Sequence, residues 1–286
     1  MEICLKRRAI ATSIIFAISS SITGCNQVRK PQMPYINFAL GQNIIKTAEK
    51  SGAPRFTSKN VAGLISYSIA KLEPRVIARF AAPGFEVEVG SLFALTMYAD
   101  EDNRNDLGVE QVTLQIAEDA VKSHASARAF VDALISQFTL GAWTRHIPAH
   151  CPQVRGRSTY LTVAGDVDEM NSCPLDPRYR VPEEDWLVLM KEGQRYEWSG
   201  AGVLAALSLK YSEQGGKITY DIWLEFQDEV IGIRRMKEKL AAQLAEGEAA
   251  GRNSLKKHEA RVKKREELIQ VLEQNAIRRG DGLQGH

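Results

Sequence analysis

The chain has 286 residues, and its 37 Lys and Arg nearly balance its 35 Asp and Glu, for a net charge of +2. This balance gives no general positive field, so we expect no nucleic-acid partner. The length suits one large domain or two small ones, and a hydrophobic content of 44% is ordinary for a globular protein.

The first residues follow the three-zone pattern of an export signal. Lys6, Arg7 and Arg8 form a positive start, residues 9–22 are mostly apolar, and small residues follow. The apolar run is too short for a membrane span, which needs about 20 mostly apolar residues. We expect residues 1–24 to be a signal peptide and the polar, proline-containing residues 25–34 to be a tether.

The signal ends in Ile22-Thr23-Gly24-Cys25, which resembles the lipobox of bacterial lipoproteins. The resemblance implies a diacylglycerol on the Cys25 thiol, cleavage before Cys25 and, usually, acylation of the new amino terminus. Two or more acyl chains give a stable membrane anchor where one is marginal. The alternative is a cleaved signal in which the cysteine is incidental. Asn26 replaces the Asp that tends to hold enterobacterial lipoproteins at the inner membrane, which favours the outer membrane, on the side facing the periplasm.

Residues 35–228 are predicted to form an α+β globular region, either as one body or as two subdomains that meet near residues 141–181. Residues 35–51 have a helical spacing of apolar positions, and residues 64–80 hold one strand or two. Alternation of apolar and polar residues predicts paired strands at 85–98 and 109–116. Apolar residues at steps of three and four predict a helix at 126–138.

The second half of the chain continues this mixture. Residues 182–193 have the Pro start, acidic first turn and Gly end of a short helix. Residues 196–211 and 218–226 are predicted to pair as antiparallel strands around Gly215-Gly216. Residues 229–280 form either a helical hairpin broken at Gly251-Arg252-Asn253 or one long broken helix. The predicted fold class is therefore α+β, with antiparallel sheet packed by helices and a C-terminal helical hairpin.

Cys151 and Cys173 are the two cysteines that remain beyond the lipobox. In an oxidising compartment a disulfide between them is favoured, with two buried free thiols or a metal site as alternatives. His146 and His150 lie close to Cys151, but Pro148 between them argues against a helical metal-binding pair. We expect neither a metal nor a cofactor.

Motifs for catalysis are missing from the sequence. It has no Gly-x-Ser-x-Gly nucleophile elbow and no P-loop, and its histidines have no obvious nucleophilic Ser or Cys partner. We therefore expect a protein that is not an enzyme. A hydrolase with a dispersed active site is the alternative, because catalytic residues are often scattered along a sequence.

Aromatic and arginine residues crowd the irregular stretch around the two cysteines. Trp, Tyr and Arg are the usual anchors of protein interfaces. One interpretation is therefore a partner-binding surface stapled by the disulfide, and the other is that the Trp residues fill the core while the Arg residues solvate a loop. The candidate partner-binding residues are Trp143, Arg145, Arg155, Arg157, Arg178 and Tyr179.

Several short motifs give the body a resemblance to uncharacterised proteobacterial lipoproteins encoded near type VI secretion effectors. They are Ala127-Arg128-Ala129-Phe130-Val131 with Phe138, Gly141-Ala142-Trp143, Gly156-Arg157-Ser158, Asp176-Pro177 and Glu184-Asp185-Trp186. The resemblance implies an immunity function, in which a periplasmic lipoprotein plugs a sibling toxin such as a lipase. The competing hypothesis is a structural or assembly lipoprotein whose helical C-terminus docks on an envelope complex. In both hypotheses the partner is a protein, a toxin or an envelope component.

Overall fold

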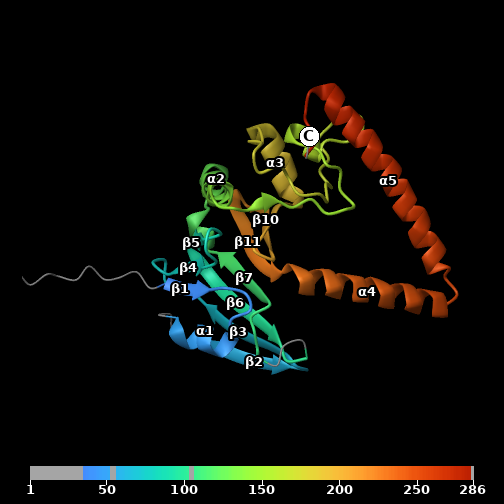
Figure 1. Ribbon diagram of the computed structural model, residues 1–286. Helices are drawn as coiled ribbons and strands as arrows, with labels where there is room; N and C mark the ends of the chain where they lie inside the picture. Colours follow the sequence, from blue (N-terminus) through green and yellow to red (C-terminus); the bar gives the residue numbers. More distant parts are fainter. Residues whose placement is uncertain (1–34, 52–55, 103–105, 285–286) are drawn as a thin grey trace, which may run out of the picture. The chain divides into compact units, whose positions relative to one another are not determined.

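The computed structural model describes residues 35–51, 56–102 and 106–284 (Figure 1). In these residues the chain forms a large antiparallel sheet, a smaller sheet and five α-helices. This confirms the α+β class predicted from the sequence. The predicted signal peptide, Cys25 and the tether lie outside the described residues.

The large sheet has eight strands in the order β2-β3-β6-β7-β11-β10-β9-β8, and each neighbouring pair is antiparallel. Along β11 the side chains of Tyr220, Ile222, Leu224 and Phe226 are buried on one face, as the period of two in a strand requires. The strands are β2 (Thr57–Val61), β3 (Leu64–Ala70), β6 (Leu92–Asp100), β7 (Gln111–Ile116), β8 (Thr144–Arg145), β9 (Gln194–Gly200), β10 (Val203–Gln214) and β11 (Lys217–Asp228).

The smaller sheet packs on this buried face. It contains β1 (Tyr35–Phe38), β4 (Ile77–Phe80) and β5 (Val87–Val89), with β1 parallel to β4 and β4 antiparallel to β5. The rings of Phe38 and Phe80 lie 5.4 and 4.8 Å from the ring of Phe226, measured between centroids. Aromatic contacts of this kind join the two sheets in one core.

Helices cover the same face. Helix α2 (His124–Leu140) begins with a Ser123 capping box and buries Ala127, Val131, Leu134 and Phe138, which confirms the helix predicted at 126–138. In α3 (Glu183–Glu192) the indole of Trp186 donates to the Tyr220 hydroxyl on β11 at 3.0 Å. The remaining helical turns before the hairpin are α1 (Ile44–Lys50) and the 3₁₀ turns Glu118–Ala120 and Gly156–Tyr160.

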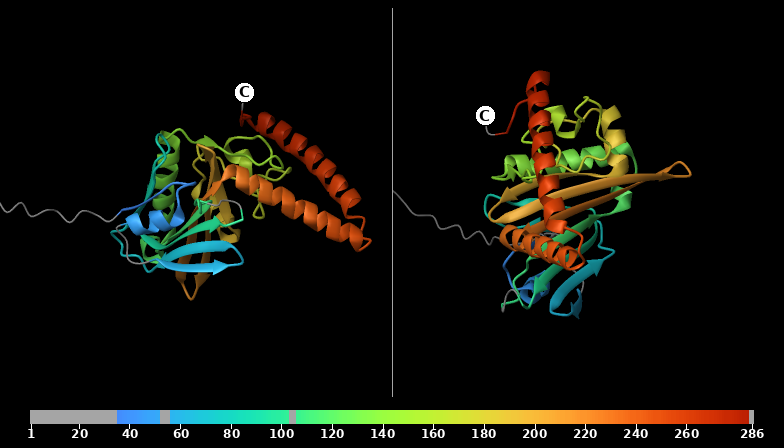
Figure 2. Two further views of the ribbon diagram at one scale, coloured as in Figure 1. Left: turned by 60° about the horizontal axis from the view of Figure 1, so that its bottom comes forward. Right: turned by 90° about the vertical axis from the view of Figure 1, so that its right-hand side faces the viewer.

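The predicted C-terminal hairpin is present as α4 (Glu229–Ala249) and α5 (Ser254–Arg279), with the break at residues 250–253. The base of α4 is fixed to the sheet by Arg235, which contacts Asp100 at 2.9 Å and Glu110 at 2.6 Å. Figure 1 and the left view of Figure 2 show α4 leading away from the sheet and α5 returning. Residues 281–284, which we call the C-terminal strap, then pair with residues 153–155 through hydrogen bonds and a Val154–Leu283 bridge.

Three predicted elements were wrong in detail. Residues 85–98 are not one strand, because Val87–Val89 pair with β4 in the smaller sheet and Leu92–Asp100 forms β6 in the large sheet. Residues 35–51 are not one helix, because residues 35–38 pair with β4 as strand β1 and only Ile44–Lys50 is helical. Residues 196–211 are not one strand, because Ala201 and Gly202 both have positive φ and form a two-residue turn between β9 and β10. Apolar periodicity did not reveal this turn, since both strands alternate through it.

Candidate binding site

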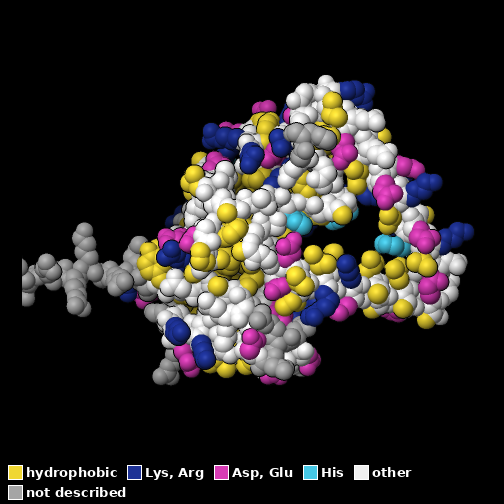
Figure 3. All heavy atoms as spheres, viewed as in Figure 1, with side chains coloured by type: hydrophobic (Ala, Val, Ile, Leu, Met, Phe, Trp, Pro, Cys, Tyr) yellow, Lys and Arg dark blue, Asp and Glu magenta, His cyan; other side chains and the backbone are white. Residues whose placement is uncertain are grey.

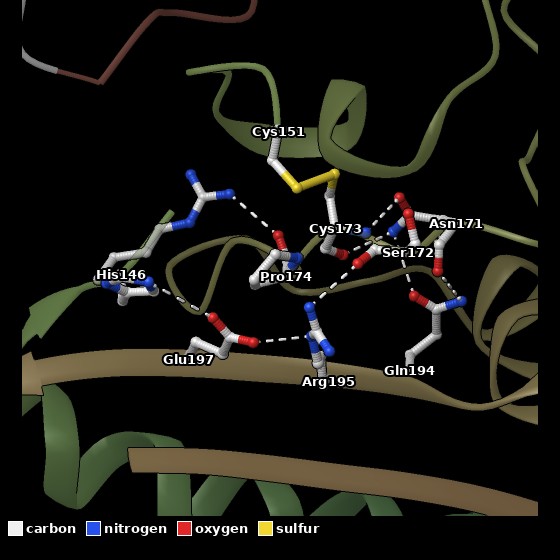
Figure 4. Close-up of polar contacts among 10 residues, drawn as sticks. His146, Cys151, Asn171, Ser172, Cys173, Pro174, Gln194, Arg195 and Glu197 are labelled. Carbon is white, nitrogen blue, oxygen red and sulfur yellow. Dashed lines mark hydrogen bonds and ion pairs between the residues drawn. A yellow bond between two sulfur atoms is a disulfide. The ribbon is translucent and has the colours of Figure 1, made fainter. Parts of the chain in front are cut away.

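Cys151 and Cys173 form a disulfide, with an S–S distance of 2.14 Å and a Cα–Cα distance of 5.6 Å (Figure 4). Of the alternatives left open by the sequence, the structure has the bridge. It staples a stretch with little regular structure, residues 146–181, which we call the disulfide segment. Both sulfurs lie in buried residues.

Strand β9 holds the disulfide segment in place through polar contacts. The Asn171 amide donates to the Gln194 amide oxygen at 3.1 Å, and the Arg195 guanidinium donates to the Ser172 carbonyl at 3.2 Å. The backbone N–H of Leu175 donates to the Arg195 carbonyl at 2.9 Å. Figure 4 shows the side-chain contacts converging beneath the disulfide. The loop is therefore fixed by contacts of its own in addition to the bridge.

Glu197 is the buried carboxylate of this network. It forms an ion pair with Arg195 at 2.8 Å and lies 3.9 Å from His146. Burial raises the pKa of Glu197 above its usual range, while Arg195 and His146 act in the opposite direction. Sequence reasoning missed Glu197, because an acidic residue in an alternating strand is normally read as facing solvent.

Four of the six candidate partner-binding residues line one pocket: Trp143, Arg145, Arg155 and Arg178. We call it the arginine pocket, and its cavity volume is about 210 Å³. The structure brings these residues together from the segment between α2 and β8, from β8 itself and from the disulfide segment. The other lining residues are Phe138, Thr139, Thr144, Asp176, Pro177, Trp198 and Gln284.

The floor of the arginine pocket is aromatic. Phe138 stacks on Trp198 with ring centroids 4.0 Å apart, and the Trp143 indole donates to the Phe85 carbonyl at 3.1 Å. Arg145 lies directly opposite Trp198 in the β8–β9 ladder, so its side chain is on the same face of the sheet. Trp143 and Trp198 are thus buried in the core and also line the arginine pocket, while partner binding at this surface stays a prediction.

Arg157 and Tyr179 do not line this pocket. Arg157 donates to both carboxylate oxygens of Asp185 on α3, at 2.9 and 3.0 Å, and the Tyr160 hydroxyl donates to the same carboxylate at 2.7 Å. This arrangement raises the pKa of Arg157 chiefly through the hydrogen bond to Asp185. Tyr179 packs beside Tyr160, with ring centroids 6.4 Å apart. Arg157 therefore ties α3 to the disulfide segment.

A second surface lies on the hairpin. Large apolar side chains recur on α4 at helical spacing and remain exposed: Val230, Ile233, Met236 and Leu240. In Figure 3 hydrophobic side chains gather on the side of α4 that faces an opening bordered by α5. We call these four residues the α4 stripe. Exposed apolar patches of this kind are typical of interaction sites.

Comparisons with protein-family models, curated proteins and solved structures found no match for this chain. Within residues 35–51, 56–102 and 106–284, no helix combines the length and apolar character that crossing a membrane requires. The same ranges contain no group of three or more His, Cys, Asp or Glu side chains placed to hold a metal ion. Any role of the arginine pocket therefore has to be inferred from the contacts that its own residues make.

Proposed function

We propose that this chain is exported, anchored to a membrane by a lipid on Cys25, and acts on the periplasmic side as a protein-binding module. The lipobox-like ending of the first 25 residues supports export and anchoring. The Cys151–Cys173 disulfide is consistent with an oxidising compartment. Asn26 favours the outer membrane. The proposal assigns the chain no catalytic role.

The observation that carries the binding role is the arginine pocket. It places two exposed arginines, Arg155 and Arg178, above an aromatic floor on a segment that the disulfide and β9 hold in position. Arginine and tryptophan are the side chains that most often dominate the energy of protein interfaces. A rigid scaffold also lowers the entropy lost on binding.

We propose further that the partner is a toxin that the protein neutralises. Support comes from the resemblance of its short motifs to lipoproteins encoded near type VI secretion effectors. The second candidate is a structural or assembly lipoprotein, and the exposed α4 stripe favours it, because an apolar helix face suits docking on an envelope complex.

A capture experiment separates the two candidates. The purified protein is passed through periplasmic extract in parallel with three variants: Arg155→Gln/Arg178→Gln in the pocket, Ile233→Ser/Met236→Ser on the stripe, and Arg180→Gln as the matched surface control. Toxin binding predicts loss of the captured protein with the pocket variant alone. Loss with the stripe variant alone favours the assembly role, and capture of nothing by any form argues against both.

The anchor is tested in cells with a clickable fatty acid. We expect the wild type to be labelled and the Cys25→Ser variant to remain unlabelled, because the thiol is the proposed acceptor. Both forms are compared at equal expression, measured with an antibody against the body of the protein. Equal labelling of the two forms would contradict lipidation of Cys25.

A further inference from the structure

The guanidinium of Arg145 is largely buried without a carboxylate in hydrogen-bonding contact among the described residues. Its Nη1 donates to the Val154 carbonyl at 2.7 Å and the Gln284 side-chain oxygen at 3.3 Å, and its Nη2 donates to the Pro174 carbonyl at 3.1 Å. All three acceptors are neutral. The Nε is buried and has no hydrogen-bond partner in the described part of the chain.

Such a cation is costly to bury unless an anion neutralises it. Burial lowers the pKa of Arg145, the nearby Asp176 raises it, and Arg155 lowers it further. A buried arginine with a purely structural role normally forms an ion pair with a carboxylate. The guanidinium of Arg145 instead contacts backbone and amide oxygens. Arg145 is therefore held in place by neutral oxygens and lacks an anion within its own hydrogen-bonding shell among the described residues.

The rim of the pocket adds positive charge. Arg155 and Arg178 are exposed, and neither guanidinium makes a hydrogen bond or ion pair within the described residues. Among the described residues Asp176 is the one acidic residue that lines the pocket, and its carboxylate accepts hydrogen bonds from the backbone N–H groups of Gly156 at 2.8 Å and Arg178 at 3.0 Å. Three guanidiniums against one carboxylate leave an excess of two positive charges (3 − 1).

The size and lining of the pocket restrict the anion. A cavity of about 210 Å³ is below the roughly 300–1,000 Å³ typical of drug-sized ligands, so it suits one side chain or a chain end. The aromatic floor of Phe138, Trp143 and Trp198 suits the apolar stem of such a group. Asp176 in the wall repels a second negative charge, which favours a monoanion over a phosphate dianion. Guanidinium groups pair with planar carboxylates through parallel hydrogen bonds.

We propose that the arginine pocket binds a carboxylate presented by the protein partner, either an Asp or Glu side chain or a chain terminus. This inference rests on the proposed function for the partner being a protein. Arg145 fixes the carboxylate at the base of the pocket. Arg155 and Arg178 close over it from the rim, and the aromatic floor contacts the carbon atoms that carry it.

The experiment measures dissociation constants for small probes with protein purified after expression of the full chain. Tryptophan fluorescence is the readout, because Trp143 and Trp198 line the pocket. N-acetyl-glutamate methylamide represents an acidic side chain and N-acetyl-glycine represents a chain terminus. N-acetyl-glutamine methylamide is the neutral isostere, and inorganic phosphate is the competing anion. The variants are Arg155→Gln, Arg178→Gln and the control Arg180→Gln.

We expect one or both carboxylate probes to bind at least about tenfold more tightly than the neutral isostere, since a hydrogen bond to a charged group accounts for about that factor. Phosphate should bind more weakly than the carboxylate probes, because Asp176 repels its second negative charge. Each pocket variant should weaken binding by about tenfold, and Arg180→Gln should leave it unchanged. The stronger of the two carboxylate probes identifies the source of the group. Equal binding of the isostere, tighter binding of phosphate, or equal effects of all three substitutions would overturn the inference.

The two proposals fail in distinguishable ways. Capture of a protein partner by a molecule that binds no carboxylate probe overturns the pocket chemistry and leaves the proposed function standing. Arginine-dependent binding of a carboxylate probe, together with capture of no protein, supports the pocket chemistry and counts against a protein-binding role. Both results come from the same purified preparation.

Discussion

Removing the disulfide is the perturbation whose size follows most directly from the structure. The bridge joins residues 22 positions apart. In the chain-entropy model, closing a loop of that length lowers the entropy of the unfolded chain by about 11 cal/mol/K, or about 3 kcal/mol at room temperature. The hydrogen bonds from Asn171 to Gln194 and from Arg195 to the Ser172 carbonyl do not involve the bridge, so we expect the segment to stay folded on β9 without it. The effect should therefore come mainly from the unfolded state.

The assay is urea unfolding of the wild type and the Cys151→Ser/Cys173→Ser variant, each with and without reductant. We expect the variant to unfold with a free energy about 3 kcal/mol lower, which lowers the urea midpoint by about 1 M for a typical urea dependence. Reductant should lower the wild type to the same value and leave the variant unchanged, which makes the variant its own control. A loss below about 1 kcal/mol would refute the loop-closure reasoning.

Three further predictions concern the supports of the pocket, each measured by urea unfolding. Arg157→Gln should lower the free energy of unfolding by about 1.5 kcal/mol, because the buried Asp185 carboxylate loses two hydrogen bonds to the partly exposed guanidinium and keeps the one from the Tyr160 hydroxyl; a loss within about 0.5 kcal/mol would contradict this. Gly200→Ala should cost about 2 kcal/mol, because its new Cβ would lie 2.4 Å from the Phe85 ring; an unchanged midpoint would contradict that clash. Glu197 has a raised pKa in the folded state, so its contribution to stability is present at low pH and declines as pH rises through that pKa. The stability of wild type relative to Glu197→Gln should thus be greater at pH 4 than at pH 7, and a difference that grows with pH would contradict the sign.

The elements that the sequence predicts well are those with a strong local pattern. The alternation of Tyr220, Ile222, Leu224 and Phe226 identifies the buried face of β11, and the hairpin break follows from Gly251-Arg252-Asn253. Strand β2 was not predicted, because its five residues are all exposed and show no apolar alternation. Periodicity reports which side of an element faces the core, and β2 has no such side.

The site was predicted only in part, for a different reason. The cluster of arginines around the cysteines is visible in the sequence, but their partners are distant along the chain. Arg157 meets Asp185 across 28 residues, and Arg145 meets Gln284 across 139. Residue type and spacing do not reveal such pairs, so Arg157 is indistinguishable from Arg155 and Arg178 until the fold is known.

The C-terminal strap has a consequence for how the molecule is made. Gln284 follows Arg178 by 106 positions (284 − 178), and it supplies both a wall of the pocket and an acceptor for Arg145. Synthesis proceeds from the amino end, so all three arginines have been made long before that wall exists. Nascent chains, and chains halted within the hairpin, therefore have an incomplete pocket. The C-terminal strap therefore links completion of the pocket wall to the folding of the helical hairpin that precedes it.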